Sequence, residues 1–343
     1  MLRRQKELEY KNMVVEAHAY ARAGVLGNPS DGYYGRIIAV TVGNFSAHVT
    51  LEESERIAIL PSESDGITFD DMASLAENIR IYGYYGGLRL IKAGIKRFFE
   101  YCQNHGIRLR PKNFTLRYAS DIPRQLGLGG SSAIITAAMR ALSSFYGVEI
   151  PREILPTLIL QAETEELGIN AGFMDRVIQV YEGCVYMNLD RQLIESRGYG
   201  EYERLDYRKL PSLYLAYQPS LGKVSGRVLN PIREAYSRGD PMVLESLRRL
   251  AAIADEGRAA IERGDPLRLH SLMDENFELR SRIMPISPDN MALIRTARSC
   301  GASAKFAGSG GSIIGMYTDD TMFETLTRKL GQLKAIVIKP EVR

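Results

Sequence analysis

The order of hydrophobic and polar positions predicts an antiparallel ribbon near the start of the chain. Residues 36–51 are rich in β-branched side chains, and apolar residues recur at every second position from Phe45 to Leu51. A period of two is typical of a strand with one buried face. Residues 13–26 alternate in part and run into a cluster of turn-forming residues at 27–32. We therefore expect two paired strands here, with a tight turn between them.

The rest of the chain mixes helical and strand patterns without a strict strand–helix–strand order, which favours an α+β fold over a doubly wound sheet. Residues 2–12 indicate a loose or short helical start. Helical spacing predicts helices at about 87–103, 131–146, 152–167, 174–181, 230–237, 241–262, 266–283, 288–299 and 320–331. Short β-rich runs predict further strands at 56–60, 114–118, 184–189, 213–217, 304–306, 313–317 and 334–338.

The length of the chain, 343 residues, allows two domains of ordinary size. The stretch from Asp190 to Leu210 is polar and without clear periodicity. We place the domain boundary there, which divides the chain into residues 1–200 and 201–343.

Composition and charge narrow the function classes. Hydrophobic residues make up 45% and charged residues 25%, and the net charge of +3 is too small to indicate a nucleic-acid partner. No apolar run reaches the roughly 18 residues of a membrane span. Three widely spaced cysteines indicate a reducing compartment, and the four histidines show no metal-binding spacing. We expect a cytoplasmic protein, a monomer or homodimer, that acts on a small molecule.

The strongest candidate site is a glycine-rich turn before a buried helix. Gly127, Gly129 and Gly130 directly precede Ser131 and Ser132, and a run of apolar helix formers follows. The first turn of a helix has free backbone N–H groups and a positive dipole end, and glycines let the backbone approach an anion closely. The stretch therefore predicts a phosphate-binding site. It is not a Walker A loop, because no lysine follows the glycines, nor a dinucleotide fingerprint.

Three other segments contain residues suited to phosphoryl transfer. An acidic helix end at 163–166 is followed, after a glycine-containing turn, by Asp175 and Arg176. A strand that includes Arg22 runs into the turn that ends at Asp31. A second glycine-rich loop lies at 308–311.

Together these segments resemble the GHMP kinase superfamily, in the order that the superfamily shows and over nearly the whole chain. The resemblance implies an N-terminal domain like ribosomal protein S5 and a ferredoxin-like C-terminal domain. Within the superfamily, the chain is most similar to the glucuronokinases known from plants. The segments that carry this resemblance are AYARAGVLGNPSDGYYGR, GYYGGLRL, NFTLRY with DIPRQLGLGGSSAI, AETEELGINAGFMDRVIQVYEG and AKFAGSGGS.

The resemblance implies an activity and its cofactors, ATP and Mg²⁺. The γ-phosphoryl group of ATP would pass to the anomeric hydroxyl of glucuronic acid, or a close uronic acid, to give the 1-phosphate. An alternative is a GHMP kinase for a heptose phosphate, fucose, galactose or a mevalonate-like acid. A non-catalytic regulator with a kinase fold is disfavoured, because Ser132, Glu163 and Asp175 are all present.

The resemblance also assigns roles to residues. Asp175 matches the catalytic aspartate and Arg22 the cation beside it. Ser132 and Glu163 match the magnesium ligands, with Ser131 as the alternative hydroxyl and Glu165 or Glu166 as the alternative carboxylate. The nucleotide would lie against Pro123, Gly127, Gly129, Gly130, Ser131, Ser132, Ala133, Gly308, Gly310 and Gly311.

The acceptor side is less defined by the motifs. Asp31 matches the acid that binds sugar hydroxyls in galactokinase-like members, although the turn Gly27-Asn28-Pro29-Ser30-Asp31 departs from their pattern. A uronate carboxylate would need a cation, ideally an arginine that donates two hydrogen bonds. The candidates are Arg36, Arg124 and Arg176. Tyr34, one of the tyrosines at 33–34 and 84–85, is a candidate for stacking on the sugar. Lys223 could reach a phosphate or the uronate carboxylate, although a solvated surface lysine is the favoured interpretation.

Overall fold

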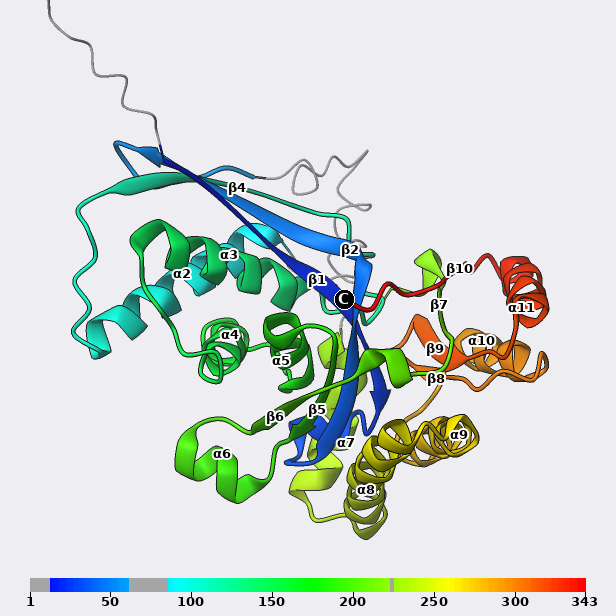
Figure 1. Cartoon of the computed structure of the whole chain (residues 1–343). Helices are drawn as coiled ribbons and strands as arrows, with labels where there is room; N and C mark the ends of the chain where they lie inside the picture. The colour runs from blue at the N-terminus through cyan, green and yellow to red at the C-terminus, as the bar shows by residue number, and fades with distance from the viewer. Residues whose placement is uncertain (1–12, 62–85, 223–224) are drawn as a thin grey trace, which may run out of the picture.

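The protein folds around two β-sheets that lie side by side (Figure 1). The structure is a computed structural model that describes residues 13–61, 86–222 and 225–343. The sequence predictions for residues 2–12, Tyr84, Tyr85 and Lys223 fall outside these ranges. Helices pack against both sheets, so the expected α+β class is confirmed.

The first sheet is built around one long strand, β2 (Arg36–Ser54), which pairs antiparallel with three other strands. The remaining strands of this sheet are β1 (Val14–Leu26), β3 (Ala58–Ile59), β4 (Asn113–Ser120), β5 (Cys184–Asn188) and β6 (Glu201–Leu205). The predicted ribbon is the β1–β2 pair, and the 3-10 turn Ser30–Gly32 joins its strands. The register of this pair shifts between Tyr20 and Ala21 and between Gly24 and Leu26.

Four helices cover one side of this sheet (Figure 1). They are α2 (Gly87–Asn104), α3 (Gly130–Tyr146), α4 (Leu155–Thr164) and α5 (Met174–Tyr181). Helix α3 is the most enclosed of them: its side chains from Ser132 to Met139 are all buried. It lies against β1 and β2, which places its N-terminus beside the Arg22 segment of β1.

The second sheet has the strand order β10-β7-β9-β8. Its strands are β7 (Leu213–Tyr217), β8 (Lys305–Phe306), β9 (Ser312–Met316) and β10 (Ile336–Ile338). The helices of this half are α7 (Ser225–Ser237), α8 (Pro241–Arg263), α9 (Pro266–Ile283), α10 (Pro288–Arg298) and α11 (Asp320–Gln332). Helices α8 and α9 reach back to β1 and β2, so the main hydrophobic core includes residues from both halves of the chain.

The reading of residues 190–210 as irregular was wrong. This stretch forms α6 (Arg191–Arg197) and β6, and β6 pairs antiparallel with β5. Helix α6 buries none of its side chains and β6 only Leu205, which explains why neither gives a periodic apolar signal. The first sheet thus continues past residue 200, and the exact division of the chain into two domains stays a prediction.

Candidate active site

A cavity of about 210 Å³ lies where the glycine-rich turn, the β1–β2 turn and the start of α5 meet. Its walls include a residue from the second half of the chain, Arg280 of α9, and the loop residues Gly308 and Ser309. Most of the predicted site residues line it. These are Arg22, Asp31, Pro123, Arg124, Gly127, Gly129, Gly130, Ser131, Ser132, Glu163, Asp175, Arg176 and Gly308.

The N-terminus of α3 forms one wall of the cavity. Gly129, the residue before the helix, has φ +78°, a left-handed conformation that glycine adopts without strain. Its carbonyl accepts hydrogen bonds from Ser132 Oγ (3.0 Å) and Gln179 Nε2 (2.8 Å). Ser132 is buried and Ser131 is partly exposed, and both line the cavity. The first turn of α3 therefore presents its backbone N–H groups and two hydroxyl side chains to the same space.

The two glycine-rich loops lie far apart in the sequence, yet Gly127 of the first contacts Gly308 of the second. A Cβ atom on Gly308 would lie 2.1 Å from Gly127 O, and one on Gly127 would lie 2.6 Å from Ser309 N. Only glycine fits at either position at this backbone separation. The close contact brings the predicted third motif to the part of the cavity where the glycine-rich turn enters α3.

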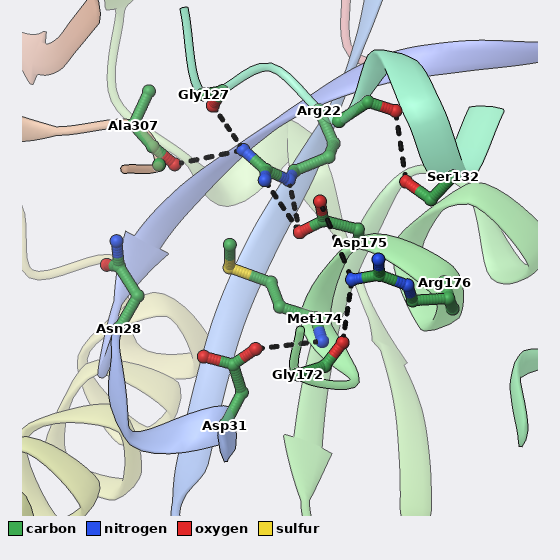
Figure 2. A network of polar contacts seen from close by, with 12 residues as sticks. Arg22, Asn28, Asp31, Gly127, Ser132, Gly172, Met174, Asp175, Arg176 and Ala307 are labelled. Carbon is green, nitrogen blue, oxygen red and sulfur yellow. Dashed lines mark hydrogen bonds and ion pairs between the residues drawn. The ribbon is translucent and has the colours of Figure 1, made fainter. Parts of the chain in front are cut away.

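An ion pair between Arg22 and Asp175 lies at the centre of the cavity wall (Figure 2). Arg22 Nε and Nη2 lie 2.7 and 2.6 Å from the same oxygen, Asp175 Oδ1. Arg22 Nη1 donates to the carbonyl of Gly127 and lies 3.4 Å from that of Ala307. Burial would raise the pKa of Asp175, but the charges of Arg22 and Arg176 outweigh it and hold the pKa below its usual range. Asp175 is thus an ionised carboxylate that faces the cavity.

A second buried ion pair joins Arg176 to Glu163. Arg176 Nε donates to Glu163 Oε2 at 2.7 Å, and Nη2 donates to the same oxygen. Nη1 donates to Gly172 O at 2.8 Å. Burial raises the pKa of Glu163 against the opposing charge of Arg176. Arg176 therefore holds the turn before α5 and neutralises a buried carboxylate.

Asp31 reaches the cavity from the β1–β2 turn. Its Oδ2 accepts a hydrogen bond from the backbone N–H of Met174 at 3.2 Å (Figure 2). Burial and the nearby charge of Asp175 raise the pKa of Asp31. The two aspartates thus have pKa values that move apart, an arrangement that gives two carboxylates different roles at one pH.

Five predicted residues lie elsewhere. Arg36 is 3.5 Å from Asp255 Oδ2, and the exposed Tyr34 ring contacts Arg191, so neither is among the described residues that line the cavity. Ala133 is fully buried within α3. Gly310 and Gly311 line a neighbouring cavity of about 70 Å³.

The sequence analysis missed Arg280, which lines both cavities. A signal was present: Leu269, Met273, Asn276 and Arg280 follow one another at helical spacing on α9, and all four are buried. Polar side chains in such a stripe are unusual and need partners. Asn276 has them, since its side chain bonds Gly27 N (2.7 Å) and Asn28 O (3.1 Å) in the turn that leads to Asp31.

Among the residues that the structure describes, no helix is both long and apolar enough to cross a bilayer. Within the same ranges, no group of three or more His, Cys, Asp or Glu side chains is arranged to hold a metal ion.

Comparisons with known proteins agree with this fold. The profile of the GHMP kinases N terminal domain matches residues 89–183, and that of the GHMP kinases C terminal domain matches residues 258–333. The chain therefore belongs to the GHMP kinase family. It is 43% identical to probable glucuronokinase 2 of Arabidopsis thaliana over 88% of this chain and 84% of that protein.

Two further relatives place the chain within the family. Glucuronokinase 1 of Arabidopsis thaliana is 40% identical, again over 88% of this chain and 84% of that protein. The crystal structure of Methanococcus jannaschii mevalonate kinase superposes with a TM-score of 0.71 at 18% identity, covering 98% of this chain and 99% of that one. The latter likeness concerns the fold alone, and it confirms the two-domain GHMP kinase architecture.

Proposed function

We propose that this protein is a glucuronokinase, which transfers the γ-phosphoryl group of ATP to the anomeric hydroxyl of glucuronic acid. The observation that carries the proposal is the Arg22–Asp175 ion pair, which faces the same cavity as the N-terminus of α3. One end of the cavity thus suits phosphate and the other a hydroxyl to be activated. The similarity to two glucuronokinases supports the choice of acceptor.

In the proposed reaction, the backbone N–H groups at the start of α3 bind the phosphates of ATP. The anomeric O–H of the sugar donates to Asp175, which accepts the proton as the oxygen attacks the γ-phosphorus. The bond between that phosphorus and the bridging oxygen of ADP breaks, so the products are the sugar 1-phosphate and ADP. Arg22 acts through Asp175: its charge keeps the carboxylate ionised and fixes its orientation.

The donor set fits Mg²⁺, which prefers oxygen ligands and keeps several waters. Ser132 and Glu163 line the same cavity, and both hydrogen bonds from Arg176 fall on Glu163 Oε2. Glu163 Oε1 and a hydroxyl at the start of α3 would hold the ion, which supplies charge neutralisation for the phosphates. Glu163→Gln should then raise the free Mg²⁺ concentration for half-maximal activity, whereas Glu165→Gln, an exposed pair with Arg97, should not.

The test of the activity is a panel of acceptors with ATP and Mg²⁺, read as ADP formation. Glucuronate should be turned over, while galactose, fucose, mevalonate and a heptose phosphate should react far more slowly. Phosphorus NMR of the product identifies the position, because a 1-phosphate couples to the anomeric proton. Turnover of a neutral sugar or mevalonate without turnover of glucuronate would refute the proposal. The predicted cytoplasmic location and the monomer or homodimer stay predictions.

A further inference from the structure

Arg280 is a buried cation, two of whose nitrogens have no hydrogen-bond partner among the described residues. Its side chain is among the largest fully buried ones in the described chain, with 2% of its surface exposed. Nη1 donates to Gly308 O at 2.7 Å, and the guanidinium lies over the ring of Phe306. Nε and Nη2 have no hydrogen-bond partner among the described residues. Buried donors without acceptors are unfavourable, which is the pattern expected where a ligand completes the bonding.

The two nitrogens without partners, Nε and Nη2, form the edge of an arginine that commonly binds carboxylates. Nε and Nη2 of an arginine project two parallel N–H bonds that match the two oxygens of a carboxylate. In this cavity, Nε and Nη2 of Arg22 pair with Asp175, and Nε and Nη2 of Arg176 pair with Glu163. Arg280 has no such internal carboxylate within ion-pair distance among the described residues.

Arg280 contacts Gly308 of the loop assigned to the nucleotide, but its helix also connects it to the acceptor side. It lies one helical turn after Asn276, whose side chain holds the turn that leads to Asp31. The charge of Asp31 acts on Arg280, although burial lowers the Arg280 pKa to about 10. Asp31 suits the hydroxyls of a sugar, so an arginine beside it suits a carboxylate on the same sugar.

We infer that Arg280 binds the carboxylate of the acceptor through Nε and Nη2 and thereby makes the site specific for uronic acids over neutral sugars. The inference rests on the proposed function. Both nitrogens are covered in this structure, so binding requires a small rotation of the guanidinium toward the cavity that the side chain lines. The inference adds a residue from the second half of the chain to the carboxylate-binding candidates chosen from the sequence, of which Arg124 and Arg176 also line the cavity.

Steady-state kinetics of Arg280→Gln tests the inference. The KM for glucuronate should rise by about 10- to 100-fold, the size expected for loss of charge-assisted hydrogen bonds. The KM for ATP should stay unchanged. Arg280→Lys should recover only part of the loss, because lysine keeps the charge without the paired donors. Arg282→Gln, an exposed arginine two positions along the same helix, is the matched control and should behave like the wild type.

Titration calorimetry with glucuronate, in the presence of a nonhydrolysable ATP analogue, gives a second readout that does not depend on turnover. Binding of glucuronate to the wild type and its loss in a folded Arg280→Gln variant would support the inference even if no product formed, in which case only the proposed reaction would fail. An unchanged affinity for glucuronate would overturn the inference. Weaker binding of the ATP analogue alone would also overturn it, since Arg280 would then serve the phosphates.

Discussion

Arg22 Nε donates a hydrogen bond to Asp175 Oδ1 at 2.7 Å, and Arg22 Nη2 lies 2.6 Å from the same oxygen in an ion pair. Its third nitrogen contacts the carbonyls of Gly127 and Ala307, one in each glycine-rich loop. One side chain of β1 thus connects the proposed base to the backbone at both glycine-rich loops. The geometry links the ionisation of Asp175 to the position of these loops.

Replacement of Asp175 by Asn should abolish most of the activity without loss of nucleotide binding. The amide cannot accept the hydroxyl proton, and general-base catalysis is worth about 10²- to 10⁴-fold in rate. The kcat with glucuronate should fall by that factor, while the affinity for a nonhydrolysable ATP analogue is kept. Asp320→Asn, a highly exposed aspartate paired with Lys339, is the control. A kcat close to the wild-type value would remove Asp175 from the mechanism.

Arg22→Met should change both the pH profile and the stability. Burial of Asp175 would no longer be opposed by Arg22, so its pKa should rise and the acidic limb of kcat/KM should move to higher pH. Removal of one partner from a buried ion pair costs about 3–5 kcal/mol. Because the pKa of Asp175 is lower in the folded state, its ionisation stabilises the protein at pH values above the pKa of the unfolded state. This stabilisation is lost as the pH falls through the pKa of the folded state. The difference in unfolding free energy should therefore be largest near neutral pH.

The double variant Arg22→Met/Asp175→Asn separates the interaction energy of the pair from the effect of each single substitution on the unfolding free energy. Without the carboxylate, no unpaired charge remains, so part of the stability should return relative to Arg22→Met alone. Urea denaturation of the four proteins at pH 7 measures the coupling. Strictly additive effects would show that the two side chains do not interact in solution.

Asp31→Asn should stabilise the protein at neutral pH while it weakens acceptor binding. The pKa of Asp31 is raised in the folded state by burial and by Asp175. The unfolded state therefore ionises first as the pH rises above about 4, and the folded state loses stability until the pH passes its own pKa. The amide removes this penalty and can still accept from Met174 N. Thermal unfolding between pH 4 and 8 should show a gain that grows with pH.

The acceptor kinetics of the same variant supply the contrasting readout. An ionised Asp31 accepts two or more hydroxyl hydrogen bonds, and the amide accepts fewer, so the KM for glucuronate should rise by about 10-fold. If the variant lost stability at neutral pH, the buried carboxylate would be stabilised by partners that the structure does not show.

The sequence motifs identified the glycine-rich turn before α3 and the residues of the Arg22–Asp175 pair, because both lie in short segments with distinctive residues. Their catalytic roles stay predictions, although the structure brings the residues together. The fold class followed from the mix of helix and strand patterns. The secondary structure of the segment 190–210 could not be predicted in this way, because α6 buries no side chain, β6 buries only Leu205, and β6 pairs with β5 through its backbone.

The acceptor side depends on tertiary contacts that local patterns do not contain. Arg36 and Arg280 are both arginines near apolar residues in the sequence, yet Arg36 pairs with Asp255 at the surface and Arg280 is buried in the cavity wall. The difference arises because α9 packs against β1 from the other half of the chain. The one sequence signal for the position of Arg280 was the presence of polar side chains, Asn276 and Arg280, in a buried stripe of α9.

A close contact between Gly172 and Asp31 offers a last test of the acceptor side. A Cβ atom on Gly172 would lie 2.2 Å from Asp31 Oδ2 and 3.0 Å from Gly32 N. Gly172→Ala must therefore displace the Asp31 carboxylate, at a cost of about 1–3 kcal/mol in unfolding free energy, and should raise the KM for glucuronate with the KM for ATP unchanged. Gly331→Ala in α11, where a Cβ meets open space, should be neutral or stabilising by up to about 1 kcal/mol. Urea denaturation and steady-state kinetics of both variants measure this, and equal behaviour of the two would show that the 31–172 contact does not exist in solution.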